Sequence, residues 1–87
     1  MRGKLAISKS GHDKGRLYVI IREEATDIYL ADGKIRTVEK PKRKNKKHIQ
    51  IIKNLPEEIT ALLTQTKEFR NEEIKRAIKL YMHKQEV

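Results

Sequence analysis

The residues best suited to binding chemistry are a dense set of cations in the middle of the chain. Six of the eight residues from 40 to 47 are lysine or arginine, and Glu39 is the only acid beside them. We expect the phosphates of a nucleic acid to relieve their repulsion through direct contacts and counterion release. With five to seven such contacts, the logarithm of the binding constant plotted against the logarithm of the salt concentration has a slope of roughly −3.5 to −6, which we call the log–log salt slope. The residues predicted to contact the phosphates are Lys40, Lys42, Arg43, Lys44, Lys46 and Lys47, with His48 next to them.

A second group of donors lies in the stretch SGHDKGR, residues 10–16. Gly11 and Gly15 permit a positive φ or the close approach of another backbone. The alternative interpretation is an ordinary glycine-rich turn. The donors around these glycines are Lys9, His12, Lys14 and Arg16.

Catalytic and metal-binding patterns do not emerge. The chain has no cysteine, and His12, His48 and His83 do not share a ligand spacing. Asp13 follows His12 directly, and adjacent side chains seldom point at one centre. There is no Walker-type loop or nucleophile–base arrangement. We expect a protein that is not an enzyme, with no cofactor and no metal.

The positive charge is confined to the first three-fifths of the chain. The formal net charge is +9, and residues 1–53 carry fifteen Lys and Arg against six Asp and Glu. This asymmetry indicates a polyanionic partner: nucleic acid, an anionic membrane surface or an acidic protein. The longest apolar run, residues 17–21, is far shorter than the ~20 residues of a membrane helix. We expect a cytoplasmic protein.

The elements that must position these cations are short strands, with turn residues between them. Residues 4–8, 16–24 and 26–31 have strand composition, and Asp32-Gly33 is a hairpin signal. Residues 34–39 begin a fourth strand and residues 48–53 form a fifth. Because Pro41 disfavours regular pairing, we place the basic segment 40–47 in a loop. Five short strands at this spacing predict a small antiparallel barrel over residues 1–53.

Residues 54–87 change to helical periodicity. In the first predicted helix, residues 54–66, Pro56 suits the first helical position, and Ile59, Leu62 and Leu63 form an apolar stripe. The second, residues 71–87, has Asn71 as a plausible cap. Its apolar positions, at i, i+3, i+4, i+7 and i+8, are Ile74, Ala77, Ile78, Tyr81 and Met82.

The strand parities predict where these helices pack. Leu17, Val19 and Ile21 alternate on one side, which we assign to the barrel interior together with Ile28 and Leu30. The opposite set would face outward beneath a helical cover, because so small a barrel buries too little surface alone. We favour packing over base stacking for the two tyrosines of this outward set, which comprises Tyr18, Ile20 and Tyr29.

The loop and its flanking strands LAIS and LYVII resemble a KOW motif, with Gly15 at the signature glycine. With LADGKIRTVEKPKRKNKKH, residues 3–50 are similar to small bacterial KOW-domain RNA-binding proteins. Those are related to the archaeal and eukaryotic large-subunit ribosomal proteins of the "fourteen-e" family. The resemblance implies an SH3-like barrel that binds structured RNA, in particular ribosomal RNA, through residues 11–16. It does not extend to residues 54–87.

The sequence therefore predicts an RNA-binding protein, ribosomal or ribosome-associated, with a KOW-type barrel followed by two helices that pack on it. Two alternatives remain open. One is a protein-interaction module of a transcription or translation complex, with the C-terminal helices as the surface that docks a protein partner, since KOW domains of NusG-type elongation factors bind proteins. The other is a nucleoid-type DNA binder, because a basic run does not distinguish ribose from deoxyribose.

Overall fold

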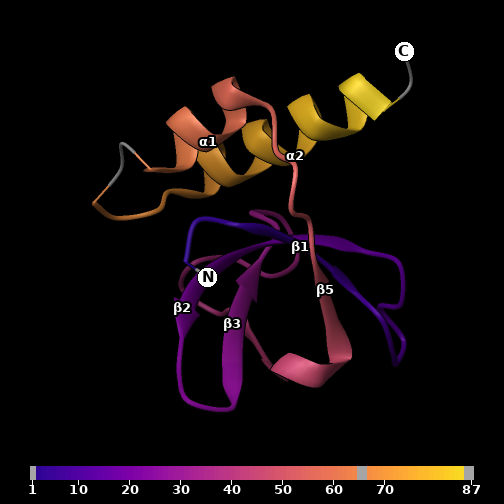
Figure 1. Ribbon diagram of the computed structural model, residues 1–87. Helices are drawn as coiled ribbons and strands as arrows, with labels where there is room; N and C mark the ends of the chain where they lie inside the picture. Colours follow the sequence, from indigo (N-terminus) through magenta and orange to yellow (C-terminus); the bar gives the residue numbers. More distant parts are fainter. Residues whose placement is uncertain (1, 65–66, 86–87) are drawn as a thin grey trace.

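A computed structural model describes residues 2–64 and 67–85 and shows two layers, with the helices on one face of a sheet (Figure 1). The prediction of five strands and two C-terminal helices is confirmed. The strands are β1 (Leu5–Ser8), β2 (Leu17–Glu23), β3 (Asp27–Ala31), β4 (Lys42–Asn45) and β5 (Ile49–Ile51). The helices are the 3₁₀ turn η1 (Lys46–His48), α1 (Glu57–Thr64) and α2 (Asn71–Gln85).

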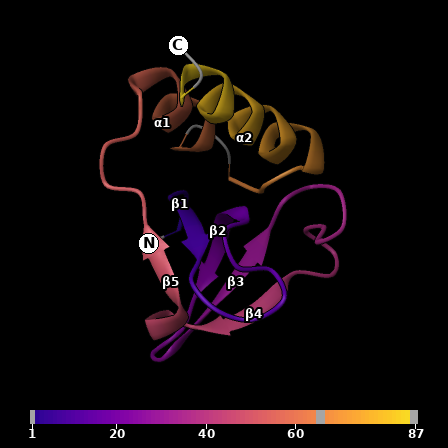
Figure 2. The same cartoon turned by 90° about the vertical axis from the view of Figure 1, so that its right-hand side faces the viewer.

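The sheet is antiparallel throughout, in the order β4-β3-β2-β1-β5, so consecutive strands β4 and β5 lie at opposite edges. Only η1 joins them, and a three-residue 3₁₀ turn spans about 6 Å. Four strand spacings in a flat sheet would need about 19 Å. The sheet must therefore curl strongly, which brings its two edges together at η1 (Figure 2). Within the described residues β4 and β5 do not pair, and the sheet is not closed into the expected barrel.

The fourth strand is not where the sequence placed it. Residues 34–39 are a loop, and the basic segment supplies β4 instead, which pairs with β3 from Leu30↔Lys42 to Asp27↔Asn45. Pro41 lies just before β4, which has only one neighbour in the sheet. An edge strand tolerates proline at its start, so Pro41 did not exclude pairing.

The Asp32-Gly33 turn does not make a tight hairpin, because the connection from β3 to β4 runs from residue 32 to 41. Asp32 Oδ1 accepts hydrogen bonds from the backbone N–H groups of Lys34 and Arg36, both at 2.9 Å. The loop then reaches α2, where Val38 N–H donates to Asn71 Oδ1 at 2.9 Å. Asn71, the expected helix cap, is the first residue of α2, and its side chain binds this loop.

The predicted faces are exchanged for β2 only. Ile28 and Leu30 of β3 lie inside the curled sheet, as predicted. Leu5, Val19 and Ala31 form a core with the helices, and Leu17 and Ile21 pack against it. The concave face holds a second core made of Ala6, Tyr18, Ile20, Ile28, Leu30 and Ile49. A register shift between Ile20 and Arg22 offsets β2 from β3, so the parities of the two strands cannot be matched from sequence.

The helices provide the other half of the first core. Ile59 and Leu63 of α1 and Ile74 and Ala77 of α2 are buried against the sheet, as their spacing predicts. Pro56 lies one residue before α1. Met82 is the exception in the predicted stripe, because it is 51% exposed.

Candidate nucleic-acid interface

The loop between β1 and β2, residues 9–16, has the conformation that its glycines suggested. Gly11 and Gly15 have φ of 84° and 89°. Gly15 N–H donates to Ser8 O at 2.9 Å, and Arg16 N–H donates to Asp13 O at 2.9 Å, which turns the chain back into β2. The side chains of the four predicted donors are exposed, namely Lys9, His12, Lys14 and Arg16.

Asp13 is the exception in this loop, because it is buried at the open end of the concave face. Ser8 Oγ donates to Asp13 Oδ1 and the Tyr18 hydroxyl donates to Asp13 Oδ2, both at 2.9 Å. Two lysines of β4 complete the shell: Lys44 Nζ is 2.8 Å from Oδ1, and Lys42 Nζ is 3.1 Å from Oδ2. Lys44 Nζ also donates to Ser10 O at 2.7 Å. The carboxylate thus ties the loop to β4.

These contacts set the protonation of the cluster. Burial alone would raise the pKa of Asp13, but hydrogen bonds from Lys44, Lys42, Tyr18 and Ser8 outweigh it and hold the pKa well below 3.8. Burial and the bond to Asp13 raise the pKa of Tyr18 to about 12. At neutral pH the cluster therefore holds one carboxylate, a neutral phenol and two ammonium groups.

Lys42 and Lys44 are therefore engaged in ion pairs with Asp13, and their binding to phosphates stays a prediction. They pair with Leu30 and Ile28 and so lie over the concave core, where their stems cover apolar side chains. The Lys44 side chain is only 10% exposed. Our argument counted Glu39 as the only acid near the segment in the sequence, but the fold also brings Asp13 to Lys44 from 31 residues away.

Two further members of the basic run are paired with acids of neighbouring strands. Arg43 points to the opposite face of β4, and its Nη2 is 2.7 Å from Asp27 Oδ2. Lys46 Nζ is 2.8 Å from Glu23 Oε2 and, as the main cause, lowers the pKa of Glu23 to about 2. The Arg43 side chain is still 64% exposed, so it can reach a ligand while it is paired.

The remaining predicted cations have no acidic partner in the part of the chain that the structure describes. Lys9 and His48 are adjacent, because Lys9 N–H donates to His48 O at 2.8 Å. The structure therefore brings loop 9–16 and η1 together, and we call their exposed donors the loop–turn surface: Lys9, His12, Lys14, Lys47 and His48. Lys40 is exposed at the end of loop 32–41. Arg16 lies at the other end of loop 9–16, beside α2.

Sequence reasoning missed the structural role of Asp13, which it considered as a neighbour of His12 and, through the resemblance, as part of the RNA-binding loop 11–16. Tyr18 packs rather than stacks, as expected, but on the concave face and not beneath a helix. One signal was available: Lys42 and Lys44 share a parity, and a loop acid flanked by glycines can fold onto such a pair. The distance in sequence gave no means of choosing Asp13 over the other acids.

Other kinds of site are not apparent. No cluster of potential metal ligands occurs among the residues described, and none of the described helices is long and apolar enough to cross a membrane. No protein-family model matches the chain, and no curated protein matches it with significant similarity.

Proposed function

We propose that this chain is a non-enzymatic RNA-binding protein, ribosomal or ribosome-associated, which grips structured ribosomal RNA through the loop–turn surface. The observation that carries the proposal is that two segments, joined by the backbone hydrogen bond from Lys9 to His48, carry exposed lysines with no ion pair among the described residues. Fixed cations of this kind suit phosphate contacts, because little ordering is required on binding.

The sheet supports the same proposal. Its curled strand order, with a single turn between the two edge strands, is compatible with the SH3-like KOW barrel that the loop sequence resembles. Gly11 and Gly15 adopt the positive φ that lets the loop present its donors outward. With Tyr18 buried and Tyr29 bonded to Glu24, recognition relies on phosphate and shape rather than on base stacking.

The ion pairs reduce the number of phosphate contacts that we expect. Lys9, Lys14 and Lys47 form the unpaired centre of the surface, so the log–log salt slope with base-paired RNA should be about −3. Lys40 and Arg43 lie further along the basic run and would steepen the slope if the ligand is long enough to reach them.

The test removes three charges from the centre of the loop–turn surface and compares this variant with one that loses three charges elsewhere. The variant Lys9→Gln, Lys14→Gln, Lys47→Gln should bind salt-washed large ribosomal subunits and an rRNA hairpin at least tenfold more weakly, with a much flatter salt slope. The matched control is Lys4→Gln, Lys53→Gln, Lys67→Gln, whose residues are exposed away from the surface. Equal losses in both variants would mean that net charge alone drives binding.

Competition separates RNA from the DNA alternative. A duplex DNA of the same length as the hairpin should compete poorly at physiological salt, because its groove geometry differs from that of an A-form helix. DNA that competes as well as RNA would favour the nucleoid-type alternative.

A further inference from the structure

A second basic region lies beside α2, in a groove of about 1260 Å³ between this helix and the ends of two loops. Loop 32–41 forms one wall and rises to the start of α2 (Figure 2). The two are in close contact: a Cβ on Gly33 would lie 2.5 Å from Asn71 O and 2.8 Å from Lys75 Cγ. Together with the bond between Val38 and Asn71, this contact gives the groove a preformed wall.

The rim of the groove is cationic. Five exposed cations line it, and none of them has an ion pair within residues 2–64 and 67–85: Arg16, Lys34, Lys75, Arg76 and Lys79. Asp32 is the only acid among the lining residues, and its Oδ1 already accepts two backbone hydrogen bonds. The rim is therefore complementary to a ligand with several negative charges.

The floor of the groove is aliphatic, which favours a ligand with an apolar face over a nucleic acid. Leu17, Ile78 and Leu80 are half-buried there, and Met82 is 51% exposed. Ile78 and Met82 are one turn apart on α2, and Lys75 and Lys79 flank them. The lining contains no Phe, Tyr or Trp, and its one aromatic ring is the imidazole of His83, so it offers little surface for base stacking. A flexible thioether beside aliphatic side chains suits the apolar face of a helix.

We propose that this groove binds an acidic amphipathic helix of a partner protein, with its apolar stripe on the Ile78–Met82 floor and its carboxylates against the rim. The proposal is independent of the RNA-binding function, because the groove does not include Lys9, Lys14 or Lys47. It gives α2 a role in addition to covering the sheet.

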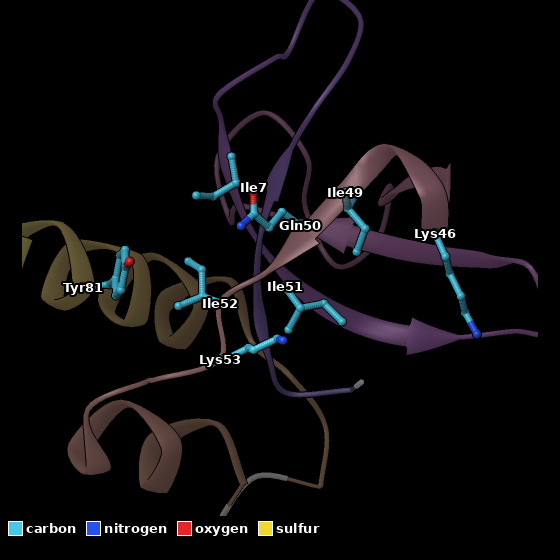
Figure 3. Close-up of a pocket in the computed structure, with 8 residues that line it drawn as sticks. All are labelled: Ile7, Lys46, Ile49, Gln50, Ile51, Ile52, Lys53 and Tyr81. Atoms are coloured by element: carbon cyan, nitrogen blue, oxygen red, sulfur yellow. The ribbon is translucent and has the colours of Figure 1, made fainter.

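A second hollow serves as the internal comparison. It has a volume of about 730 Å³ and lies along β5, where Ile7, Ile51, Ile52 and Tyr81 supply apolar surface (Figure 3). Only two cations line it, Lys46 and Lys53, and Lys46 is paired with Glu23. An acidic helix should therefore select the α2 groove over this hollow.

The test uses the full chain and a fluorescein-labelled peptide with leucines at i, i+3, i+4 and i+7 and glutamates on the flanks. The variant Lys75→Glu, Lys79→Glu should bind it at least tenfold more weakly, because two rim attractions become repulsions. Met82→Ser should weaken binding by about threefold through the lost apolar contact. The matched control, Lys53→Glu, Lys67→Glu, should change affinity less than about twofold.

Two further measurements distinguish binding in the α2 groove from nonspecific charge attraction and from binding in the hollow along β5. A peptide of the same composition with its leucines scattered should bind weakly, and backbone amide shifts on titration should map to Leu17, Ile78 and Met82 but not to Ile49 or Ile51. Equal binding of the scattered peptide, shifts centred on β5 or an equal loss in the control variant would overturn the proposal. It would also fail if the Lys75→Glu, Lys79→Glu variant lost affinity for the rRNA hairpin and not for the peptide.

Discussion

β4 and the loop–turn surface are both rich in cations, yet their cations have different surroundings. In β4, Lys42 and Lys44 converge on the carboxylate of Asp13, at 3.1 and 2.8 Å. Lys9, Lys14 and Lys47 stand in solvent, and no acid pairs with them in the described part of the chain. The most concentrated basic run of the sequence is thus divided between cations held in ion pairs and cations that are exposed without a pair among the described residues.

The difference shows that charge density along a sequence does not measure charge available to a partner. A buried acid pairs with two lysines, of which Lys44 is only 10% exposed, and these pairs tie the loop that carries other cations to β4. The two regions are therefore linked: Asp13 and Lys44 position loop 9–16, and the loop presents Lys9 and Lys14. Changes that separate stability from binding test this division.

The largest expected effect comes from Asp13→Asn. The substitution leaves Lys44 buried without its anion, and breaking a buried pair of this kind costs about 3 kcal/mol of unfolding free energy. Chemical denaturation at neutral pH, followed by circular dichroism, measures the loss.

The control for this variant is Asp27→Asn, which removes the partner of the mostly exposed Arg43 and should destabilise much less. The double variant Asp13→Asn, Lys44→Met should recover part of the lost stability, because the stranded charge is gone. If the two aspartate variants were equally stable, Asp13 would not be the structural anion that its contacts indicate.

The elements that were predicted correctly are those with apolar periodicity. β1, β2, β3 and both helices alternate or repeat hydrophobic residues, and burial of those residues determines their structure. β4 has no apolar residue, so no hydrophobic pattern marks it as a strand. Its pairing depends on β3, on Asp13 and on the curl of the sheet, all of which are properties of the whole fold.

The candidate site likewise has features that the local sequence predicts and features that depend on the whole fold. The glycines of loop 9–16 and the exposure of Lys9, His12 and Lys14 follow from local sequence. The pairing of Lys42 and Lys44 with Asp13 depends on contacts between residues about thirty positions apart, which a single sequence does not encode in any local pattern.

Acid should weaken the fold through the same carboxylate. Because the pKa of Asp13 in the folded protein lies well below 3.8, the unfolded chain takes up the proton first as the pH falls. The stabilisation is complete above about pH 5 and is lost progressively as the pH falls through 3.8 toward the folded-state pKa. Unfolding free energies measured by urea titration at a series of pH values should show this decline.

Asp13→Asn provides the control for the pH series, because it lacks the titrating group. Its stability should fall more gently with acid, and a residual slope should come from Glu23 and Glu39, whose pKa values are also lowered by hydrogen bonds from Lys46 and Asn71 respectively. Superimposable pH profiles for the two proteins would exclude Asp13 as the main acid-sensitive group.

The smallest expected effect comes from Arg43→Gln, and it sharpens the comparison because Arg43 belongs to neither region fully. It is paired with Asp27 like the lysines above Asp13, yet its side chain is 64% exposed like those of the loop–turn surface. Its charge is partly screened by Asp27, so affinity for the rRNA hairpin should fall by less than in Lys47→Gln. The log–log salt slope should change by less than the ~0.9 expected for the loss of one phosphate contact. Titrations of both variants at several salt concentrations measure the difference. A loss in Arg43→Gln as large as that in Lys47→Gln would show that exposure, and not the absence of an acidic partner, decides which cations bind RNA.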